Sequence, residues 1–259
     1  MNLKYIDIHS HLNAPEFEKD LDDVVSRMEE SNTGTIVVGV DKETSRRAIE
    51  IAEKYENIWA CVGFHPTDYK EVYDEIFLEG LISNPKVVAI GECGLDYFHQ
   101  KDKSDRKSQR ELFEKQIDLA ATKRLPLMLH VRDAHEDALE ILFSKKKEHG
   151  ETLRGNSHFF TSTLDIAKKY FELGFTISIS GVATFSSVLD EVIKKSPMES
   201  LLIETDSPYA SPEPFRGKRN EPSNVSQIAL KIAQIKGLLA EEVSRELLNN
   251  SISRFHLRA

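Results

Sequence analysis

Cysteine is scarce in this chain, and long apolar runs are absent from it. Two cysteines in 259 residues are too few for a disulfide framework. Cys61 and Cys93 each lie in an apolar, strand-like run, which favours reduced thiols in the core. No apolar run approaches the ~18 residues that a membrane span needs. The N-terminus lacks the basic and then apolar pattern of a signal peptide, so a cytoplasmic location is the expectation.

Basic residues are outnumbered by acidic ones. The chain has 34 Lys and Arg against 43 Asp and Glu, which gives a formal net charge of −9. This balance argues against a protein that grips nucleic acid over a broad surface. It does not exclude an enzyme that acts on phosphates, because two divalent ions would reverse the local sign at an acidic site. Linkers rich in Pro, Gly or Ser are also lacking, and we expect one domain over residues 1–259.

Apolar, often β-branched runs alternate with charged segments of helical spacing along the whole chain. Eight runs have the composition of strands: 5–11, 34–40, 59–64, 87–95, 126–131, 156–160, 175–180 and 201–206. Helical periodicity falls between and after them, near residues 21–28, 48–55, 71–83, 105–124, 135–147, 163–173, 186–195, 222–236 and 240–255. The alternation predicts parallel strands joined by crossover helices. We therefore expect the α/β class and a single (β/α)8 TIM-type barrel, with an open doubly wound sheet as the rival.

The first of these runs, YIDIHSH, places an aspartate and two histidines among isoleucines. Successive side chains of a strand point to opposite faces, so we expect Asp7, His9 and His11 on one face. Ile6 and Ile8 would then lie on the other. Two imidazoles two residues apart at the end of a strand fit one metal ion. The alternative is a half-buried strand whose polar face meets water.

Ligand-type side chains stand at the same end of several runs: His9 and His11, Glu92, His130, His158 and Asp206. A barrel brings these strand ends to one mouth. A catalytic zinc typically has three protein ligands and a water, so this larger set suits two ions, Mg, Mn or Zn, that share a bridging carboxylate. One histidine in an apolar run is more often a hydrogen-bonded core residue, and it is the joint pattern that favours metal. The other histidines are expected at the surface or behind the ligands: His99, His135, His149 and His256.

The motifs around these residues resemble those of the TatD family of metal-dependent deoxyribonucleases, within the amidohydrolase-type barrels. They run in order over nearly the whole chain: IDIHSHL (6–12), GFHP (63–66), GECGLDY (91–97), LPLMLHVRDA (125–134), ETDSPY (204–209) and RGKRNEP (216–222). The resemblance implies DNA as the substrate, cleaved from single-stranded ends. The ligand set that it implies is His9, His11 and Asp206 for one ion, His130 and His158 for the other, and Glu92 between them.

The chain departs from the family pattern in two places. After the histidine of the sixth strand the family commonly has Cys-Phe-Ser-Gly-Ser, whereas this chain has FFTST at 159–163. The missing glycine leaves the conformation of this loop open. Cys93 stands where a branched aliphatic residue is usual. Alternation aims its thiol away from the face of Glu92, so we expect it to pack in the core.

Four residues carry the predictions about catalysis. Water held between two divalent ions becomes a hydroxide that attacks an electrophilic centre, and Asp206 is the predicted proton acceptor. Glu204 shares its strand face by parity and is predicted to bond a ligand histidine or help move a proton, unless it turns out to solvent. His65 is predicted to donate to a phosphate oxygen or the leaving group. Its alternative is capping the turn at Pro66. Asp7 is predicted to orient ligands.

Cations and aromatic residues follow the strand ends and are the predicted substrate contacts. The cations are Arg132, Arg216, Lys218 and Arg219. Such residues can bind the phosphate backbone of a polyanion. The alternative is that they form an ordinary solvent-exposed charged surface. The aromatic residues, which either stack bases or close over the core, are Tyr97, Phe98 and Tyr209.

The residues themselves predict metal-assisted hydrolysis, whereas DNA as the substrate is implied only by the resemblance to the family. The predicted function is a metal-dependent hydrolase, a deoxyribonuclease of the exonuclease type. The alternative is an amidohydrolase or esterase that acts on a carbonyl substrate such as an aminoacyl ester or lactone, since the same hydroxide would serve. A third possibility is a non-catalytic barrel that binds other proteins, but all six ligands are intact here. Neither a membrane nor an obligate protein partner is expected.

Overall fold

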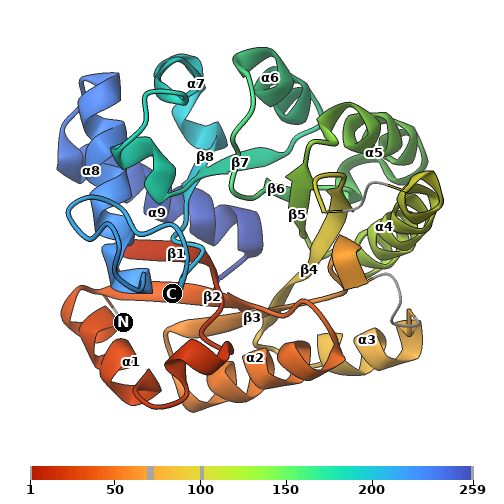
Figure 1. Ribbon diagram of the computed structural model, residues 1–259, viewed down its shortest axis with the longest axis horizontal. Helices are drawn as coiled ribbons and strands as arrows, with labels where there is room; N and C mark the ends of the chain where they lie inside the picture. The colour runs from red at the N-terminus through yellow and green to blue at the C-terminus, as the bar shows by residue number, and fades with distance from the viewer. Residues whose placement is uncertain (1, 69–72, 100–101, 258–259) are drawn as a thin grey trace.

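The computed structural model describes residues 2–68, 73–99 and 102–257. Its centre is one sheet of eight parallel strands in chain order (Figure 1). The first and last strands also meet, because Ser10 pairs with Ser207 and the Asp206 N–H donates to the carbonyl oxygen of His9 at 2.9 Å. The predicted (β/α)8 barrel is confirmed. Its strands are β1 (Tyr5–Ser10), β2 (Thr33–Val38), β3 (Ile58–Val62), β4 (Val87–Asp96), β5 (Leu127–Arg132), β6 (Gly155–Ser157), β7 (Thr176–Ile179) and β8 (Leu201–Ile203).

Helices surround the barrel (Figure 1). They are α1 (Leu21–Glu30), α2 (Lys42–Lys54), α3 (Glu75–Ile82), α4 (Lys103–Lys123), α5 (His135–His149), α6 (Leu164–Glu172), α7 (Asp190–Lys195), α8 (Val225–Lys236) and α9 (Ala240–Phe255). A reciprocal cap starts α2: Asp41 Oδ1 accepts from the Thr44 N–H at 2.7 Å, and Thr44 Oγ1 accepts from the Asp41 N–H at 3.1 Å. Among the described residues, no helix is both long and apolar enough to cross a lipid bilayer.

Apolar side chains fill two regions, one on each side of the barrel wall. The larger lies between the strands and the surrounding helices. The smaller lies inside the barrel, where Ile6, Ile36 and Met128 pack with Phe255 and Leu257 at the end of α9. Figure 1 shows α9 behind the strands, and it contacts both β1 and β8. Packing therefore closes the N-terminal end of the barrel and leaves the C-terminal ends of the strands as the open mouth.

Two strands are shorter than their apolar runs predict. β6 ends at Ser157 and β8 at Ile203, although the runs continue to 160 and 206. Just beyond them the backbone takes φ angles of 45° at Phe159 and 53° at Asp206, in the left-handed region. The strands end because the chain turns at these positions. Asp206 is therefore presented to the mouth by a turn, as is His158 beside Phe159, and not by regular strand.

Some helices also begin later than predicted. α7 begins at Asp190 and not near 186, because a 3-10 turn over Gly181–Thr184 follows β7. Another 3-10 turn, Pro222–Asn224, precedes α8. Of the helix predicted near 71–83, residues 71 and 72 lie outside the described residues, and α3 begins at Glu75.

Strict alternation fails in β1, which corrects the prediction for its side chains. Ile6 and Ile8 lie in the apolar cluster inside the barrel. The His9 imidazole also faces the barrel interior, where it stacks at 3.9 Å on another histidine of the mouth. An irregularity in the pairing of β1 with β2, between Asp7 and Ser10, permits this arrangement. The expected division, with the isoleucines on one face and Asp7 beside the histidine on the other, is therefore wrong.

A glycine permits the close approach of β4 to β5. Gly94 has a φ of 143°, and a Cβ built there would collide with the carbonyl oxygen of His130. The neighbouring Cys93 is buried in the outer apolar region, as predicted. Both it and Cys61 are free thiols.

Candidate metal centre

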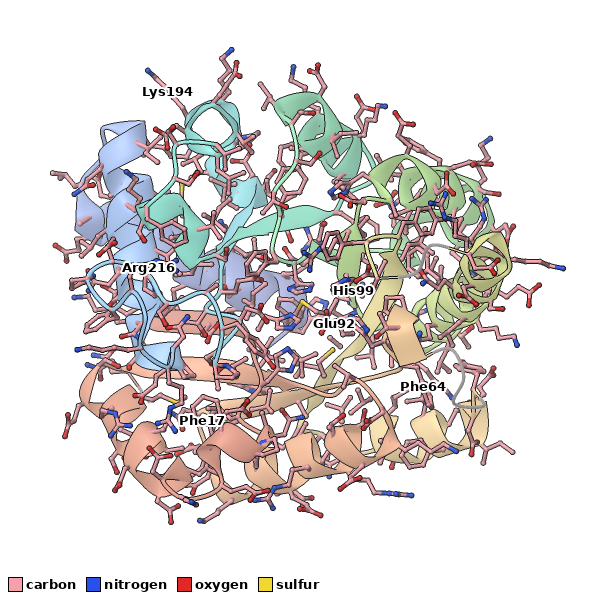
Figure 2. The ribbon with its side chains drawn as sticks, in the orientation of Figure 1. Phe17, Phe64, Glu92, His99, Lys194 and Arg216 are labelled. Carbon is pink, nitrogen blue, oxygen red and sulfur yellow. The ribbon has the colours of Figure 1, made fainter. Side chains whose placement is uncertain are left out.

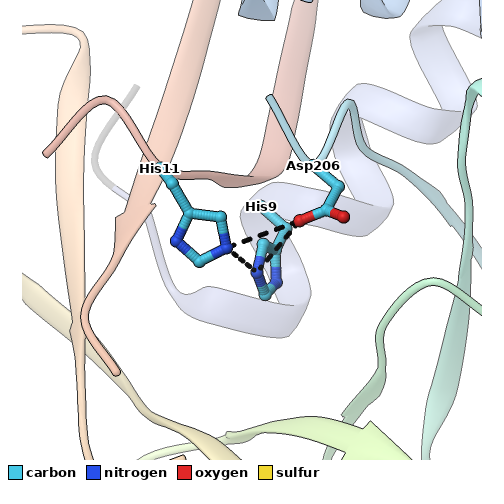
Figure 3. Close-up of side chains that lie close together, drawn as sticks. All are labelled: His9, His11 and Asp206. Atoms are coloured by element: carbon cyan, nitrogen blue, oxygen red, sulfur yellow. Dashed lines mark hydrogen bonds and ion pairs between the residues drawn. The ribbon is translucent and has the colours of Figure 1, made fainter. Parts of the chain in front are cut away.

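Three ligand-type side chains meet where the end of β1 approaches the turn after β8 (Figure 3). His11 Nε2 lies 3.2 Å from His9 Nε2 and 3.4 Å from Asp206 Oδ1. His9 Nε2 lies 3.8 Å from the same carboxylate oxygen. One donor atom from each of the three residues falls within 4.8 Å of the other two. Such a set can hold one divalent ion.

Glu92 lies among these side chains and a second group of imidazoles, near the middle of the barrel mouth (Figure 2). Its Oε1 is 2.7 Å from His130 Nδ1 and 2.8 Å from His158 Nε2. Its Oε2 is 3.4 Å from His9 Nε2 and 3.8 Å from His11 Nε2. Each oxygen of one buried carboxylate thus faces a different pair of histidines. This is the geometry that a bridge between two ions requires.

Hydrogen bonds behind the imidazoles decide which ring nitrogen faces the mouth. His11 Nδ1 lies 3.1 Å from the carbonyl oxygen of Val38, which can only accept, so that Nδ1 carries the proton and Nε2 is left as a lone pair. His130 Nε2 likewise donates to Asp96 Oδ2 at 3.0 Å and leaves Nδ1 free. For His9 no such bond fixes the tautomer, because its buried Nδ1 has no hydrogen-bond partner in the described part of the chain, and it is Nε2 that faces Asp206. The nitrogens that face the mouth in His11 and His130 are available to ligate a metal.

Glu204 lies behind His158 and is fully buried, so the alternative that it turns out to solvent is wrong. Its Oε1 accepts from the Phe159 N–H at 2.6 Å and lies 3.5 Å from His158 Nδ1. Its Oε2 accepts from Ser178 Oγ at 2.5 Å. These contacts fix the carboxylate and place it against a candidate ligand.

His65 also reaches this site, from the end of β3. Its Nδ1 accepts from the Thr67 N–H at 3.2 Å and lies 2.7 Å from the Thr67 hydroxyl oxygen. In the neutral ring the proton is therefore on Nε2, which lies 3.5 Å from Glu92 Oε1. The residue is close enough to Glu92 and His130 to join a metal site. Its tautomer favours a hydrogen-bond donor instead.

Asp7 touches the backbone around the ligands and not their rings. It accepts from the His9 N–H at 3.2 Å and the Thr205 N–H at 2.8 Å. Its other oxygen accepts from the Thr205 hydroxyl at 2.5 Å. Burial raises the pKa of Asp7 well above its ordinary value, although the bonds to Thr205 oppose this. The residue ties β1 to the segment that carries Asp206.

Asp96 was missed by the sequence reasoning. Fully buried at the end of β4, it accepts from His130 Nε2, from the His99 N–H at 2.8 Å and from His99 Nδ1 at 2.7 Å. Burial would raise the pKa of this carboxyl, but His130 and His99 hold it below its ordinary range. His99, predicted at the surface or behind the ligands, is half exposed and lies beside the site (Figure 2). The available signal was parity, because Asp96 lies four positions after Glu92 on the same strand.

The imidazoles hold the carboxylates in their ionised form. Burial would raise the pKa of Glu92, but the neighbouring His158 and His65 help to hold it well below its ordinary value. Burial also opposes ionisation of Asp206, but its contact with His11 and the effects of His9 and His158 together outweigh burial, so that this pKa is lowered too. A buried and a partly buried carboxylate that stay charged, beside nitrogens with free lone pairs, make a donor set that suits divalent cations.

A cavity of about 960 Å³ opens over the site. Arg132 and Tyr209 are among its lining residues, as is His11 on the floor. The Arg132 guanidinium lies over the ring of Phe98 at 3.9 Å, and Tyr209 is 58% exposed with its ring edge toward His11. An arginine and exposed aromatic rings therefore border the candidate ligands.

The cations of the loop after β8 are not among the residues that line this cavity: Arg216, Lys218 and Arg219. Arg219 pairs with Asp20 at 2.6 Å and with Glu221 at 3.0 Å. The Arg216 guanidinium lies over the ring of Phe185 at 3.7 Å, to one side of the site (Figure 2). Lys218 is exposed. Ion pairing holds Arg219 against Asp20, just before α1.

The loop at 159–163 turns without the family's glycine. Phe159 takes the positive φ of 45°, and its N–H donates to Glu204. Ser162, at the position of the glycine, is not among the residues with positive φ. Thr163 caps α6 by accepting from the Ile166 N–H at 3.4 Å. The loop conformation left open by the sequence therefore requires no glycine at 162.

Known proteins with similar sequences are metal-dependent hydrolases. The chain is 41% identical over 256 residues to the "uncharacterized metal-dependent hydrolase YabD" of Bacillus subtilis (strain 168), with 97% of this chain and 98% of that protein covered. It is 33% identical over 260 residues to the "uncharacterized metal-dependent hydrolase YcfH" of Escherichia coli (strain K12), with 98% and 96% covered. Together with the barrel and its His, Asp and Glu clusters, this defines the protein as a metal-dependent hydrolase.

The family follows from two further comparisons. The family model described as "TatD related DNase" matches residues 6–256. The crystal structure of YjjV, a TatD homolog from Escherichia coli k12, superposes with a TM-score of 0.89 at 29% identity and covers 99% of this chain and 100% of that one. The chain belongs to the TatD family, as its motifs predicted.

Proposed function

We propose that this TatD-family hydrolase is a deoxyribonuclease that cleaves phosphodiester bonds at single-stranded DNA ends. The observation that carries the proposal is the position of Glu92, whose two oxygens face different pairs of imidazoles on the floor of a cavity bordered by Arg132. The family supports DNA as the polymer. A cavity of this size with a guanidinium at its rim also suits a phosphate-linked substrate.

The proposed cofactors are two divalent ions, Mg, Mn or Zn. When bound, they would neutralise charge on the phosphate in the transition state and lower the pKa of a water molecule. Glu92 would bridge them. The remaining ligands would be His9, His11 and Asp206 for one ion and His130 and His158 for the other.

The chain's own residues would supply proton transfer and orientation. Asp206, whose pKa is lowered, is ionised at neutral pH and would accept a proton at its carboxylate. His65 would donate from Nε2 to a phosphate oxygen or to the leaving group. Glu204, whose Oε1 lies 3.5 Å from His158 Nδ1, would hold this ligand histidine or help to move a proton. Arg132 would bind a phosphate next to the scissile one.

The proposal is tested by supplying Mg²⁺, Mn²⁺ or Zn²⁺ to the purified protein with end-labelled single-stranded and duplex DNA. Stepwise loss of nucleotides from single-stranded ends is expected, with a decrease of at least about 100-fold in the His130→Ala variant. Activity that survives in that variant would point to a contaminant. Hydrolysis of a lactone or aminoacyl ester without cleavage of DNA would select the carbonyl alternative. A metal content below one ion per chain, together with no hydrolysis, would select a non-catalytic barrel.

A further inference from the structure

A second cavity adjoins the one over the candidate metal centre. Its volume is about 620 Å³, and it lies over the segment from the end of β5 to the first turn of α5. The two cavities share Val131, Arg132 and Thr161 as lining residues. Together they exceed the space of ~300–1,000 Å³ that one small ligand fills. A substrate that continues past the reacting group would extend from the first cavity into the second.

Two arginines at this second cavity stack on aromatic rings. The Arg106 guanidinium lies over Tyr97 at 4.2 Å, and that of Arg132 lies over Phe98 at 3.9 Å. Both side chains are exposed, and in the described ranges neither forms an ion pair with a carboxylate. Stacking occupies the face of a guanidinium and leaves the N–H groups on its edge available. Preoriented N–H edges of this kind suit a phosphate.

The neighbouring charges are arranged differently. Arg110, one helical turn after Arg106, pairs with Asp137 at 3.1 Å and with Glu140 at 3.7 Å. Asp137 also accepts a hydrogen bond from the Tyr97 hydroxyl at 2.7 Å. The charge of this carboxylate is balanced by Arg110. Glu136 lines the cavity and is exposed, as is Asp133. Their negative charges would repel a phosphate, so removing one of them should strengthen the binding of a phosphate in this cavity.

We propose that the second cavity is a subsite for the phosphodiester backbone of the substrate strand, beyond the scissile phosphate, with Arg106 as its anchor. The strand would run from the metal centre past Arg132 to Arg106. This inference rests on the proposed nuclease function and adds the direction in which the uncleaved part of the strand leaves the mouth. It assigns to Arg106 a role in substrate binding and none in the chemical step.

The test compares Arg106→Gln with Arg46→Gln, using a single-stranded octadeoxynucleotide and bis(p-nitrophenyl) phosphate as substrates. Arg46 is a matched control, because its guanidinium is also exposed and also stacks on a ring, that of Phe77 at 4.7 Å, but it lines neither cavity. For Arg106→Gln the ratio of kcat/KM on DNA to kcat/KM on the small diester should fall about 10-fold. The slope of log kcat/KM against the logarithm of the salt concentration should become smaller in magnitude by about 0.7, the value for one lost phosphate contact on a single strand. Glu136→Gln should raise the same ratio about two- to threefold.

If the ratio of kcat/KM on DNA to kcat/KM on the small diester is equal for the Arg106 and Arg46 variants, the subsite is refuted. The proposed nuclease function is not affected by that result. If the wild-type protein cleaves no DNA, the proposed function fails by itself, and binding then decides the subsite. For that purpose a fluorescent octadeoxynucleotide is titrated with His130→Ala protein and with the same protein carrying Arg106→Gln. An approximately 10-fold weaker Kd in the double variant supports the subsite, and equal values refute it.

Discussion

The bond from Asp96 to His130 offers a sharp test of how the candidate ligands are held. Asp96 is fully buried and accepts from His130 Nε2 at 3.0 Å, which leaves Nδ1 to face Glu92 Oε1 at 2.7 Å. Asp96→Asn keeps the size of the side chain and removes its charge. An amide accepts only through its one oxygen, and its NH₂ group would face a donor that now binds the carboxylate. The imidazole then loses the partner that fixes its tautomer.

The magnitude follows from the type of bond. A hydrogen bond to a charged group contributes about 1.5–3 kcal/mol, and a neutral one about 1 kcal/mol. The difference, about 0.5–2 kcal/mol, corresponds to roughly 2- to 30-fold in an equilibrium constant. Loss of the preferred tautomer adds to this, and groups behind metal ligands typically contribute 10- to 100-fold to affinity or activity. We therefore expect metal affinity to fall about 10-fold or more.

Calorimetric titration of metal-stripped protein with Mn²⁺ measures this affinity directly, and hydrolysis of bis(p-nitrophenyl) phosphate measures its consequence. Asp74→Asn is the control, because the Asp74 carboxylate also accepts a hydrogen bond, from the Phe77 N–H at 3.0 Å, but lies outside the cavity over the metal centre. The control should bind Mn²⁺ like the wild type. If Asp96→Asn also binds it within twofold of the wild type while remaining folded, the assignment of Nδ1 as the ligand atom of His130 is refuted.

Three other substitutions separate stability from chemistry. Burial lowers the pKa of His135 to about 4, so the unfolded chain takes up its proton first as the pH falls below 6.5. Wild type should therefore lose about 2.5 kcal/mol more unfolding free energy than His135→Gln between pH 7.5 and pH 4.5, measured by urea titration, and parallel curves would contradict this. Gly94→Ala should cost about 3 kcal/mol or more, because the methyl group meets the carbonyl oxygen of His130 at a φ of 143°; a melting temperature close to that of the wild type would refute the clash. Arg219→Ala should leave the rate of DNA cleavage within twofold of the wild type. It should lower the unfolding free energy by about 1 kcal/mol, because it removes the ion pair with Asp20. A large loss of cleavage would show instead that Arg219 contacts the substrate.

The position of a ligand side chain could be predicted from the sequence where it follows from the end of an apolar run. His130 follows from the end of its apolar run, because a barrel gathers those ends at one mouth. Glu92 was also predicted, although it lies within β4 where the pairing is irregular, between Ile90 and Cys93. In β1 the same reasoning failed in detail, since an irregular pairing lets Ile8 and His9 both face inward. Alternation assumes one extended conformation per residue, and an irregularity breaks that assumption. The convergence of the ligands survived because it depends on the ends of strands more than on their faces.

The loop cations show the opposite case. Arg219 follows a strand end and carries the charge that DNA would attract, yet its contacts are with Asp20 and Glu221. Asp20 lies about 200 positions earlier in the chain, and no local pattern connects the two. Arg106 went unnoticed for the same reason, because its place beside the mouth depends on how α4 packs against the loop that carries Tyr97.

By itself, the order of residues determined the barrel, the metal-ligand candidates and the family, because periodicity and short motifs are local properties of the chain. Tertiary structure alone decided which nitrogen of His11 and His130 faces the mouth, that Asp96 stands behind His130, and which arginines are free to meet a substrate. These depend on distances of about 3–4 Å between residues far apart in sequence. Such distances are set by packing, which no single segment encodes.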